Sequence, residues 1–272
     1  MRSALVNQHE QRTGAAVEIS GVSKTYLTRQ GAEVTALERL DLSLEPGSFV
    51  AVVGPSGCGK STLLSMIAGL LTMTTGEIRI DGDAIRTPHP KVGVVFQSDL
   101  LLYWRTVIDN ILLPVEIKRR DVGAYRRSAQ NLLAQVGLDG FANKFPAELS
   151  GGMRQRVAIC RALIQEPELL LMDEPFGALD ALTREQMIMD LQSMWLRVGN
   201  TVIFITHGID EAVFLADRVL VMSPRPGRVD LDLPIEIDRP RQWNNIHANE
   251  RFSHYVRAIR DVFEARGVLV SK

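Results

Sequence analysis

The stretch Gly54-Pro55-Ser56-Gly57-Cys58-Gly59-Lys60-Ser61-Thr62 decides the fold of this 272-residue chain. It has the pattern G-x-x-x-x-G-K-S of a phosphate-binding loop. The apolar run Phe49-Val50-Ala51-Val52-Val53 precedes it, and a segment with helical spacing of its apolar residues follows it. A strand, a glycine-rich loop and a helix in this order direct backbone N–H groups and the positive end of the helix toward an anion.

Two side chains of the loop extend this interpretation. We expect Lys60 to reach the β- and γ-phosphates of a nucleotide, and Ser61 to ligate Mg²⁺. The alternative is a glycine-rich turn without a ligand, which does not account for the strand and the helix on either side. The sequence therefore predicts nucleotide binding.

The composition is that of a large α/β protein. Hydrophobic residues make up 46% of the chain and the formal net charge is −1, so we predict no nucleic-acid partner held by bulk positive charge. The two cysteines have neither metal-ligand nor C-x-x-C spacing, and Cys160 is expected in the core. No apolar run is long enough to cross a bilayer. Residues 1–16 lack the apolar centre of a signal peptide and are expected to form a flexible tail on a soluble cytoplasmic protein.

Strand-like and helix-like segments alternate after the loop, as in an α/β core. From about residue 98 to 164 the pattern is mainly helical, which indicates a helical insert. Residues 245–267 place apolar side chains on one helical stripe, and we expect this helix to pack on its own domain. The stripe consists of Phe252, Tyr255, Val256, Ile259, Val262 and Phe263.

An acidic pair ends the apolar run Leu169-Leu170-Leu171-Met172. A run that is apolar on every side is typical of a central parallel strand, and ligands bind at the carboxyl edge of such sheets. Asp173 can hold Mg²⁺ there, and Glu174 can orient and deprotonate an attacking water. Two carboxylates could instead cap the next turn, but the phosphate-binding loop favours catalysis.

The segment Ser150-Gly151-Gly152-Met153-Arg154-Gln155-Arg156 resembles the signature sequence of the ATP-binding cassette (ABC) family. Its serine and glycines at a helix start would offer a hydroxyl and N–H groups to an anion. The resemblance covers about residues 17–228, with seven motifs in the family's order. It implies a P-loop core with a parallel sheet, an N-terminal antiparallel β subdomain and a helical insert.

The resemblance also implies the remaining site residues. Tyr26 resembles the aromatic residue that stacks on adenine, and Gln97 the glutamine that senses Mg²⁺ and the γ-phosphate. His207 resembles the histidine that contacts the γ-phosphate, and Asp180 lies in a loop like the one that contacts the opposite subunit. The implied catalytic residues are Glu174, His207 and Gln97. The implied Mg²⁺ ligands are Ser61, Gln97 and Asp173. The implied ATP-binding residues are Tyr26, Gly54, Pro55, Ser56, Gly57, Cys58, Gly59, Lys60, Ser61, Thr62, Ser150, Gly151 and Gly152.

Three residues depart from the family pattern. Met153 stands where glutamine is usual, Gly177 where many members have serine, and Gly208 where many have aspartate after the histidine. None of them is a catalytic residue or a Mg²⁺ ligand. The sequence therefore predicts an active ATPase and not a regulator that only binds nucleotide.

The domain organisation follows from the same resemblance. We expect the tail over 1–16, an ABC ATPase domain over 17–235 with a helical subdomain at about 98–164, and a C-terminal helical extension over 236–272. In the family, the phosphate-binding loop of one subunit and the signature segment of a second close over one ATP. One cassette therefore implies a second copy of this chain or another ABC ATPase subunit as partner.

The pattern resembles the nitrate/sulfonate/taurine branch of bacterial importers, through Phe96-Gln97, Leu101-Leu102-Tyr103-Trp104-Arg105-Thr106-Val107, Phe176-Gly177-Ala178-Leu179-Asp180 and Ser223-Pro224-Arg225-Pro226-Gly227-Arg228. That branch energises uptake of nitrate, alkanesulfonates, taurine or pyrimidine-type thiamine precursors. Transmembrane permease subunits and, indirectly, a substrate-binding protein are the implied partners, and the cytoplasmic face of the inner membrane the implied location.

Two points stay open on the residues alone. The leucines after Gln97 fit a core as well as a partner surface, whereas Trp104 and Tyr103 are expected to contact the permease. An exporter or lipoprotein-release ATPase, or a soluble ABC ATPase, is the alternative to an importer. One cassette without a heptad run or metal-spaced cysteines disfavours the soluble class.

Overall fold

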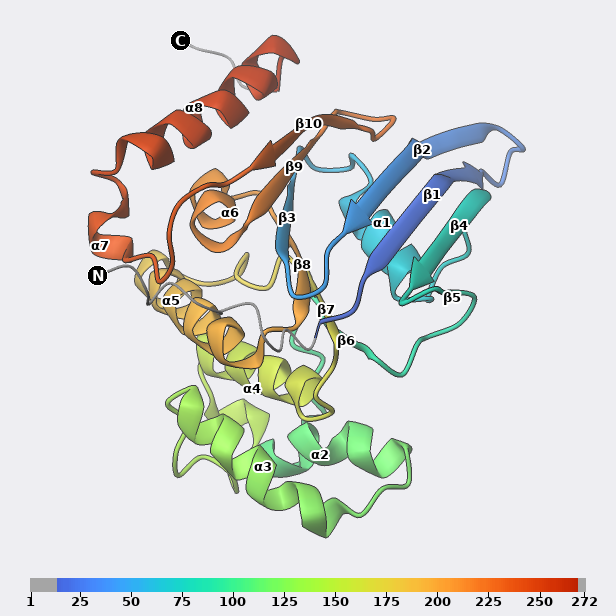
Figure 1. Cartoon of the computed structure of the whole chain (residues 1–272). Coiled ribbons are helices and arrows are strands. Elements are labelled where there is room, and N and C mark those ends of the chain that lie inside the picture. Colours follow the sequence, from blue (N-terminus) through green and yellow to red (C-terminus); the bar gives the residue numbers. More distant parts are fainter. Residues whose placement is uncertain (1–13, 269–272) are drawn as a thin grey trace, which may run out of the picture.

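A six-stranded, mainly parallel sheet forms the centre of the molecule (Figure 1). The structure is a computed structural model and describes residues 14–268. The strand order is β10-β9-β3-β8-β7-β6, and only β10 runs antiparallel to its neighbour. The strands are β3 (Phe49–Val53), β6 (Val92–Val95), β7 (Leu169–Asp173), β8 (Thr201–Thr206), β9 (Arg218–Met222) and β10 (Val229–Pro234).

The middle strands carry mainly apolar residues because helices cover one face of the sheet and a second sheet lies beyond the other. Every residue of β3 and β8 is buried. Along β3, alternate side chains enter two different cores, with Phe49 and Ala51 in one and Val50 and Val52 in the other.

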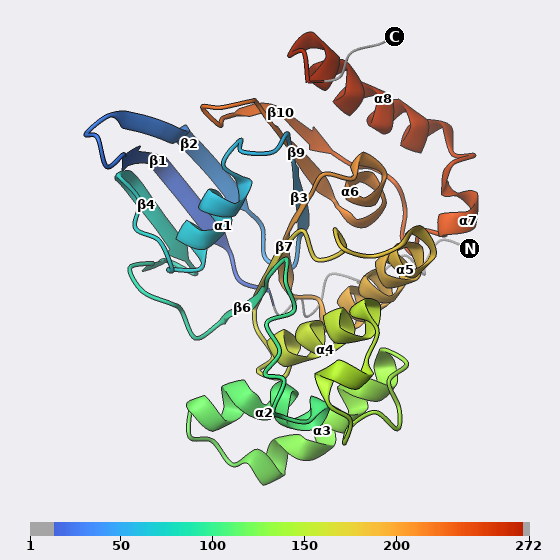
Figure 2. The same cartoon turned by 180° about the vertical axis from the view of Figure 1, so that it is seen from behind.

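The N-terminal antiparallel subdomain is a four-stranded sheet of order β2-β1-β4-β5. Its strands are β1 (Val17–Leu27), β2 (Glu33–Leu44), β4 (Thr75–Ile80) and β5 (Asp83–Ala84). Helix α1 (Lys60–Ile67) lies between this sheet and the central one, as Figure 2 shows from behind. Leu64 and Ile67 share a core with Ile19 of β1 and Val52 of β3. The helix that follows the phosphate-binding loop is thus clamped from two sides.

The helical insert forms a lobe at the end of the central sheet (Figures 1 and 2). It contains α2 (Val107–Ile117), α3 (Val122–Gln135), a 3₁₀ turn (Pro146–Glu148) and α4 (Gly151–Leu163). Helix α3 starts at a side-chain cap. Asp121 caps the helix by accepting a 2.9 Å hydrogen bond from the N–H of Gly123, so the helix begins at Val122.

Two further helices cover the face of the central sheet whose core contains Phe49 and Ala51. They are α5 (Ala181–Val198) and α6 (Ile209–Leu215). Phe49, Trp195, Phe204 and Phe176 form a chain of ring contacts with centroids 5.6–5.9 Å apart. Cys160 is buried in the same core, as predicted.

The C-terminal extension packs on α6 and β10 (Figure 1). It forms α7 (Trp243–Ile246) and α8 (Glu250–Ala265), not the single helix expected from residue 245. Asn249 separates them, because its side chain accepts hydrogen bonds from the N–H groups of Arg251 and Phe252 and so starts a new helix. The apolar stripe is confirmed, since Phe252, Ile259 and Phe263 are buried in the core.

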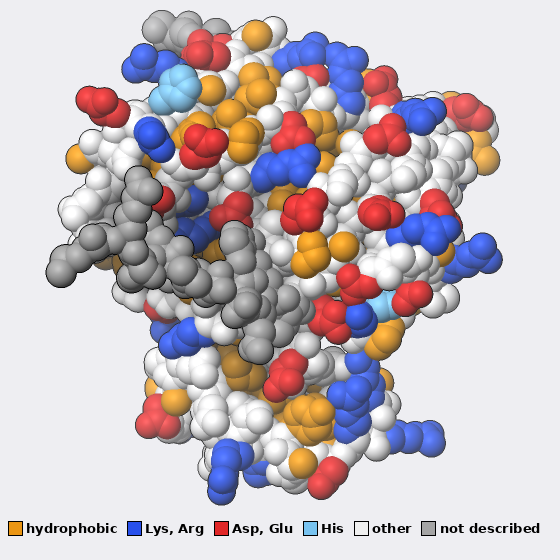
Figure 3. Space-filling view, in the orientation of Figure 1, with side chains coloured by type: hydrophobic (Ala, Val, Ile, Leu, Met, Phe, Trp, Pro, Cys, Tyr) orange, Lys and Arg blue, Asp and Glu red, His pale blue; other side chains and the backbone are white. Residues whose placement is uncertain are grey.

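The N-terminal region and the surface complete the description of the fold. Residues 1–13, most of the expected tail, lie outside the described part of the chain. Ala15 is buried and donates from its N–H to the carbonyl of Glu168. Basic and acidic side chains intermingle on the face shown in Figure 3. Across residues 14–268, no helix has both the length and the hydropathy that a membrane span requires.

The α/β core, the antiparallel subdomain and the helical insert predicted from the sequence are confirmed. The loops that follow β3, β6, β7 and β8 all leave the same edge of the central sheet, because these strands are parallel. The phosphate-binding loop, Gln97, Glu174 and His207 therefore lie along that edge.

Candidate active site

The phosphate-binding loop connects β3 to α1 and closes around the ammonium of Lys60. The lysine Nζ donates to the carbonyls of Gly54 at 2.8 Å and Pro55 at 3.0 Å, and the side chain is 5% exposed. Gly59 has φ +99°, a left-handed conformation that favours glycine, and a Cβ there would lie 2.8 Å from the carbonyl oxygen of Ala36 on β2. The loop brings a positive charge and the start of α1 together, as anion binding requires.

The other loop residues divide between surface and core. Ser56, Gly57 and Ser61 are exposed, and Thr62 is half-buried. The thiol of Cys58 is buried under the loop, with its Sγ 3.8 Å from Lys60 Nζ. Burial raises the pKa of the Cys58 thiol against the lowering effect of the Lys60 charge. Cys58 therefore contributes its backbone, not a reactive thiolate, to the loop surface.

Asp173 lies beside the loop, at the end of β7. The hydroxyl of Ser61 donates to its Oδ1 at 3.1 Å, so the structure brings two of the expected Mg²⁺ ligands together. Burial raises the pKa of Asp173, and the adjacent Glu174 carboxylate adds to the rise, while the Ser61 hydrogen bond opposes it.

The carboxylate of Glu174 is the meeting point of three loops. Its Oε2 lies 3.3 Å from Nε2 of Gln97 and 3.4 Å from Nδ1 of His207. Its backbone has φ +45°, unusual for a residue with a side chain, and its N–H donates to the carbonyl of Ile205 at 2.9 Å. A strained backbone held by the neighbouring strand keeps this carboxylate at the edge of the sheet.

The turn that carries His207 is held by residues that the sequence patterns did not reveal. Thr206 donates its hydroxyl to Oε2 of Glu211 at 2.6 Å and accepts from the N–H of Gly208 at 2.9 Å. Arg184 of α5 places its Nε 3.6 Å from the other oxygen of Glu211. The only available signal was a glutamate preceding the apolar run Ala212-Val213-Phe214-Leu215.

The departure at Gly208 has a steric explanation. A Cβ on Gly208 would lie 2.7 Å from Cδ of Glu211, so in this chain the glutamate side chain fills the space that a larger residue would need. A Cβ on Gly177, in contrast, would lie 3.5–3.8 Å from Glu174 and His207 atoms, which is ordinary contact. A serine at position 177 would therefore fit beside the site.

The signature segment starts α4. Ser150 is its N-cap and accepts from the N–H of Met153 at 3.3 Å. Gly152 lies so close to α5 that a Cβ would be 2.5 Å from Cγ2 of Thr183. Across residues 14–268, no hydrogen bond or ion pair joins Ser150, Gly151 or Gly152 to the phosphate-binding loop.

Tyr26 lies on β1 opposite Val34, with its ring 40% exposed and the Lys24 ammonium 5.1 Å from the ring centroid. Strand β2 runs on from Val34 to Ala36, which packs against Gly59 of the loop. Two residues of an extended strand span about 7 Å. The Tyr26 position on the β1–β2 pair is thus separated from the phosphate-binding loop by only about two residues of strand.

We predict that Gly208→Ala destabilises the protein more than Gly177→Ala. The new methyl group at 208 must displace the Glu211 carboxylate and break its buried hydrogen bond to Thr206, which costs about 1–3 kcal/mol. Gly177→Ala is the matched control, since its methyl group meets only ordinary contacts. Urea unfolding of the two variants measures the difference, and equal midpoints would contradict this account of Gly208.

A second prediction concerns Asp173. Because its folded-state pKa is raised, it binds a proton more tightly in the folded chain, and the stability this gives is lost as pH rises through the folded pKa. The ionised carboxylate thus destabilises the ligand-free protein at pH 7. Asp173→Asn keeps an oxygen acceptor for Ser61 and should raise the Tm at pH 7, with a smaller difference at pH 4. A lower Tm at pH 7 would show that the charge is stabilising.

Comparison with known proteins supports the reading of these motifs. The family model described as ABC transporter matches residues 37–177. The taurine import ATP-binding protein TauB of Rhizobium johnstonii is 48% identical over 92% of this chain and 97% of its own length. The aliphatic sulfonates import ATP-binding protein SsuB of Bacillus cereus is 43% identical, over 93% of this chain and 98% of its own.

Solved structures agree. The ATP-binding cassette MJ0796, in a dimeric post-hydrolysis state bound to ADP and Pi, has a TM-score of 0.72 and 34% sequence identity to this chain. The match covers 82% of this chain and all of that one. With the family model, the relatives and the fold in agreement, the chain belongs to the ABC transporter family, whose cassettes bind ATP.

Proposed function

We propose that this chain is the ATP-hydrolysing subunit of an ABC importer for taurine or a related sulfonate. The observation that carries the proposal is the approach of Gln97 and His207 to the Glu174 carboxylate, at 3.3 and 3.4 Å, beside the Ser61–Asp173 contact. The names of the two relatives, both import ATP-binding proteins, support the transport direction and the substrate class. Nitrate or a pyrimidine-type precursor is the alternative substrate.

The phosphate-binding loop would hold the triphosphate. Its N–H groups and the start of α1 attract the anion, and Lys60 would exchange its bonds to loop carbonyls for bonds to the β- and γ-phosphates. Tyr26 would stack on the adenine ring from β1. Cys58 would contribute only its backbone, because its thiol is buried.

Ser61, Asp173 and Gln97 would hold Mg²⁺. The Ser61 hydroxyl and the Asp173 carboxylate are hard oxygen donors 3.1 Å apart, which suits this cation. Residues 14–268 contain no group of three or more His, Cys, Asp and Glu side chains arranged for a metal, so the phosphates themselves would supply further ligands. Bound Mg²⁺ would neutralise charge on the β- and γ-phosphates.

Glu174 would act as the general base. Its carboxylate can accept a hydrogen bond from the attacking water and remove its proton. Gln97 and His207, both next to Oε2, would orient that carboxylate, and His207 would also contact the γ-phosphate. The arrangement supports in-line attack of water on the γ-phosphate.

A second subunit would complete the site. The signature residues Ser150, Gly151 and Gly152 have no hydrogen bond to the loop of their own chain within the described residues 14–268. The cassette MJ0796 was solved as a dimer. A second copy of this chain, or another ABC ATPase subunit, would supply the missing signature segment, and ATP would favour the closed state by binding it more tightly.

The helical lobe would contact the permease subunits. Trp104 and Tyr103 are 75% and 56% exposed, in the loop between Gln97 and α2. Leu101 is buried and Leu100 exposed, so the leucine run belongs partly to the core. An ion pair of 2.6 Å between Arg105 and Glu116 holds this loop against α2. The chain would thus sit at the cytoplasmic face of the inner membrane, with a substrate-binding protein acting on the other side.

Glu174→Gln should retain ATP binding and lose hydrolysis. The amide keeps the shape of the side chain and an oxygen that can accept the hydrogen bond from Gln97. It cannot take up a proton as a carboxylate does, so we expect kcat to fall by about 10²-fold or more. ATP with Mg²⁺ should then trap a dimer, measured by size-exclusion chromatography with light scattering. A monomer at saturating ATP would refute the shared site, and undiminished kcat would refute the role of Glu174.

Replacement of both Trp104 and Tyr103 by Ala should weaken assembly with the permease and leave the ATPase fold intact. Removal of two exposed aromatic anchors from a docking surface typically costs several kcal/mol of binding. The control is Leu70→Ala, a comparably exposed side chain on the turn after α1. Co-purification with the permease subunits gives the readout, and equal yields for the double variant and the control would exclude this docking surface.

A further inference from the structure

One short helix connects His207 to the C-terminal extension. Helix α6 has seven residues and begins at Ile209, two positions after His207. Two turns of helix do not hold together alone in water, and the last carbonyls of a helix have no partner inside it. The position of α6, and of the turn before it, therefore depends on the groups packed around the helix.

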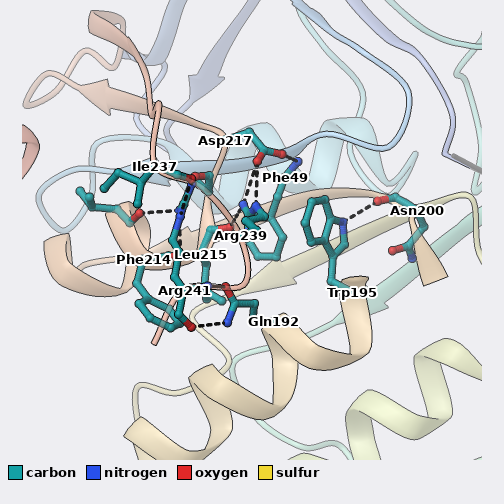
Figure 4. Close-up of polar contacts among 12 residues, drawn as sticks. Phe49, Gln192, Trp195, Asn200, Phe214, Leu215, Asp217, Ile237, Arg239 and Arg241 are labelled. Atoms are coloured by element: carbon teal, nitrogen blue, oxygen red, sulfur yellow. Dashed lines mark hydrogen bonds and ion pairs between the residues drawn. The ribbon is translucent and has the colours of Figure 1, made fainter. Parts of the chain in front are cut away.

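Arg241 of the extension caps the carboxyl end of α6 (Figure 4). Its Nη1 donates to the carbonyls of Val213, Phe214 and Ala216, each at 2.8 Å. Its Nε and Nη2 donate to the carbonyl of Ile237 at 3.2 and 3.0 Å. The side chain is 4% exposed. A buried cation at the negative end of a helix satisfies the orphan carbonyls and the helix dipole together.

Arg239 ties the same helix end to the strand before the phosphate-binding loop. Its Nη2 donates to the carbonyl of Leu215 and, at 2.8 Å, to Asp217. The other oxygen of Asp217 accepts from the N–H of Phe49, the first residue of β3, at 2.9 Å. The guanidinium also lies over the ring of Trp195 on α5, 4.4 Å from its centroid.

The backbone of Arg241 is itself fixed to α5. Gln192 donates from Nε2 to its carbonyl at 2.8 Å and accepts from its N–H at 2.9 Å. Two residues further on, the ring of Trp243 meets Phe214 of α6 edge-on, with 4.9 Å between centroids. The guanidinium thus reaches α6 from a support that cannot shift without breaking buried hydrogen bonds.

The amino end of α6 holds the histidine turn. Glu211 accepts the hydroxyl of Thr206, which in turn accepts the N–H of Gly208. The Gly208 backbone has no spare room against Glu211, as described above. A displacement of α6 would therefore be transmitted to His207, which follows Thr206 directly. Seven residues of helix span only about 10 Å between the two ends.

A cleft of about 490 Å³ shows the same proximity from the outside. Its lining residues include His207 and Gly208 of the histidine turn together with Trp243 and Arg260 of the extension. The extension is therefore a direct neighbour of the site and not a remote appendage.

From these contacts we propose that the C-terminal extension is a working part of the ATPase, and that Arg241 is a positioning residue which sets the place of His207 through α6. The proposal rests on the proposed role of His207 at the γ-phosphate. It assigns to Arg241 no contact with nucleotide. Its effect is to reduce the freedom of α6, so that the imidazole stays within reach of Glu174 and the phosphate.

Three variants of the full chain test the proposal. Arg241→Met removes the charge and the donors, whereas Arg241→Lys keeps an ammonium that can still bind the α6 carbonyls. Arg266→Met is the matched control. It removes another extension arginine, whose Nε and Nη2 bind Asp230 on β10 at 2.7 Å, and it leaves the α6 cap untouched.

The first readout is the division between kcat and KM. Because small misplacement of a catalytic group costs rate more than binding, Arg241→Met should lower kcat by about tenfold or more, with KM for ATP within about twofold. Arg241→Lys should recover most of the lost kcat. Arg266→Met should hydrolyse ATP like the unmodified protein. A folded Arg241→Met protein with undiminished kcat, or losses equal to those of Arg266→Met, would overturn the proposal.

The second readout needs no hydrolysis. In protein with ¹⁵N-labelled histidine, the His207 imidazole signal, assigned by its loss in His207→Gln, should move in Arg241→Met and stay in place in Arg266→Met. An unmoved signal would overturn the positioning role. If the unmodified protein itself hydrolyses no ATP and the His207 signal still moves in Arg241→Met, the proposed function is wrong and the positioning role of Arg241 stands. If Arg241→Met does not fold, Gln192→Met, which loosens only the support of Arg241, should show the same shift and kcat loss, and its failure to do so would count against the proposal.

Discussion

The register of four parallel strands is the constraint on which the rest of the molecule depends. Val53 pairs with Thr206, Asp173 with Ile205, and Val95 with Met172, so β3, β8, β7 and β6 end at nearly the same level. Side chains from distant parts of the chain therefore meet because the strand ends are level, and short loops are enough to place them. A slip of one residue in any strand would turn its apolar set toward the wrong core and also displace its catalytic loop.

Two cores stabilise this register from opposite faces. Helix α1 and the antiparallel sheet cover one face, and the helices α4, α5, α6 and α8 cover the other. The loop around Lys60 is therefore anchored in the core that contains α1, while the turn at His207 depends on the core that contains α6. The site is therefore held from both faces of the central sheet.

Much of this could be predicted from sequence because the relevant signals are local. Each signal lies within a short stretch of sequence: a glycine loop between a strand and a helix, an apolar run ending in Asp173 and Glu174, and alternating strand-like and helix-like segments. The supports of His207 could not be predicted this way. Thr206 and Glu211 meet across one turn through a side-chain bond that no motif encodes, and Arg184 reaches Glu211 from another helix. Arg241 lies in a segment that carries no motif. The helix expected from residue 245 was placed five residues too early, because the Asn249 side chain caps a new helix that begins at Glu250, and the apolar stripe lies wholly within that helix.

The close approach of Gly208 and Glu211 means that two positions three residues apart in sequence share one volume. A side chain at position 208 therefore requires the Glu211 carboxylate to move away from its present place beside Thr206. The departure from the family pattern at Gly208 and the hydrogen bond that fixes the histidine turn are thus features of one local arrangement.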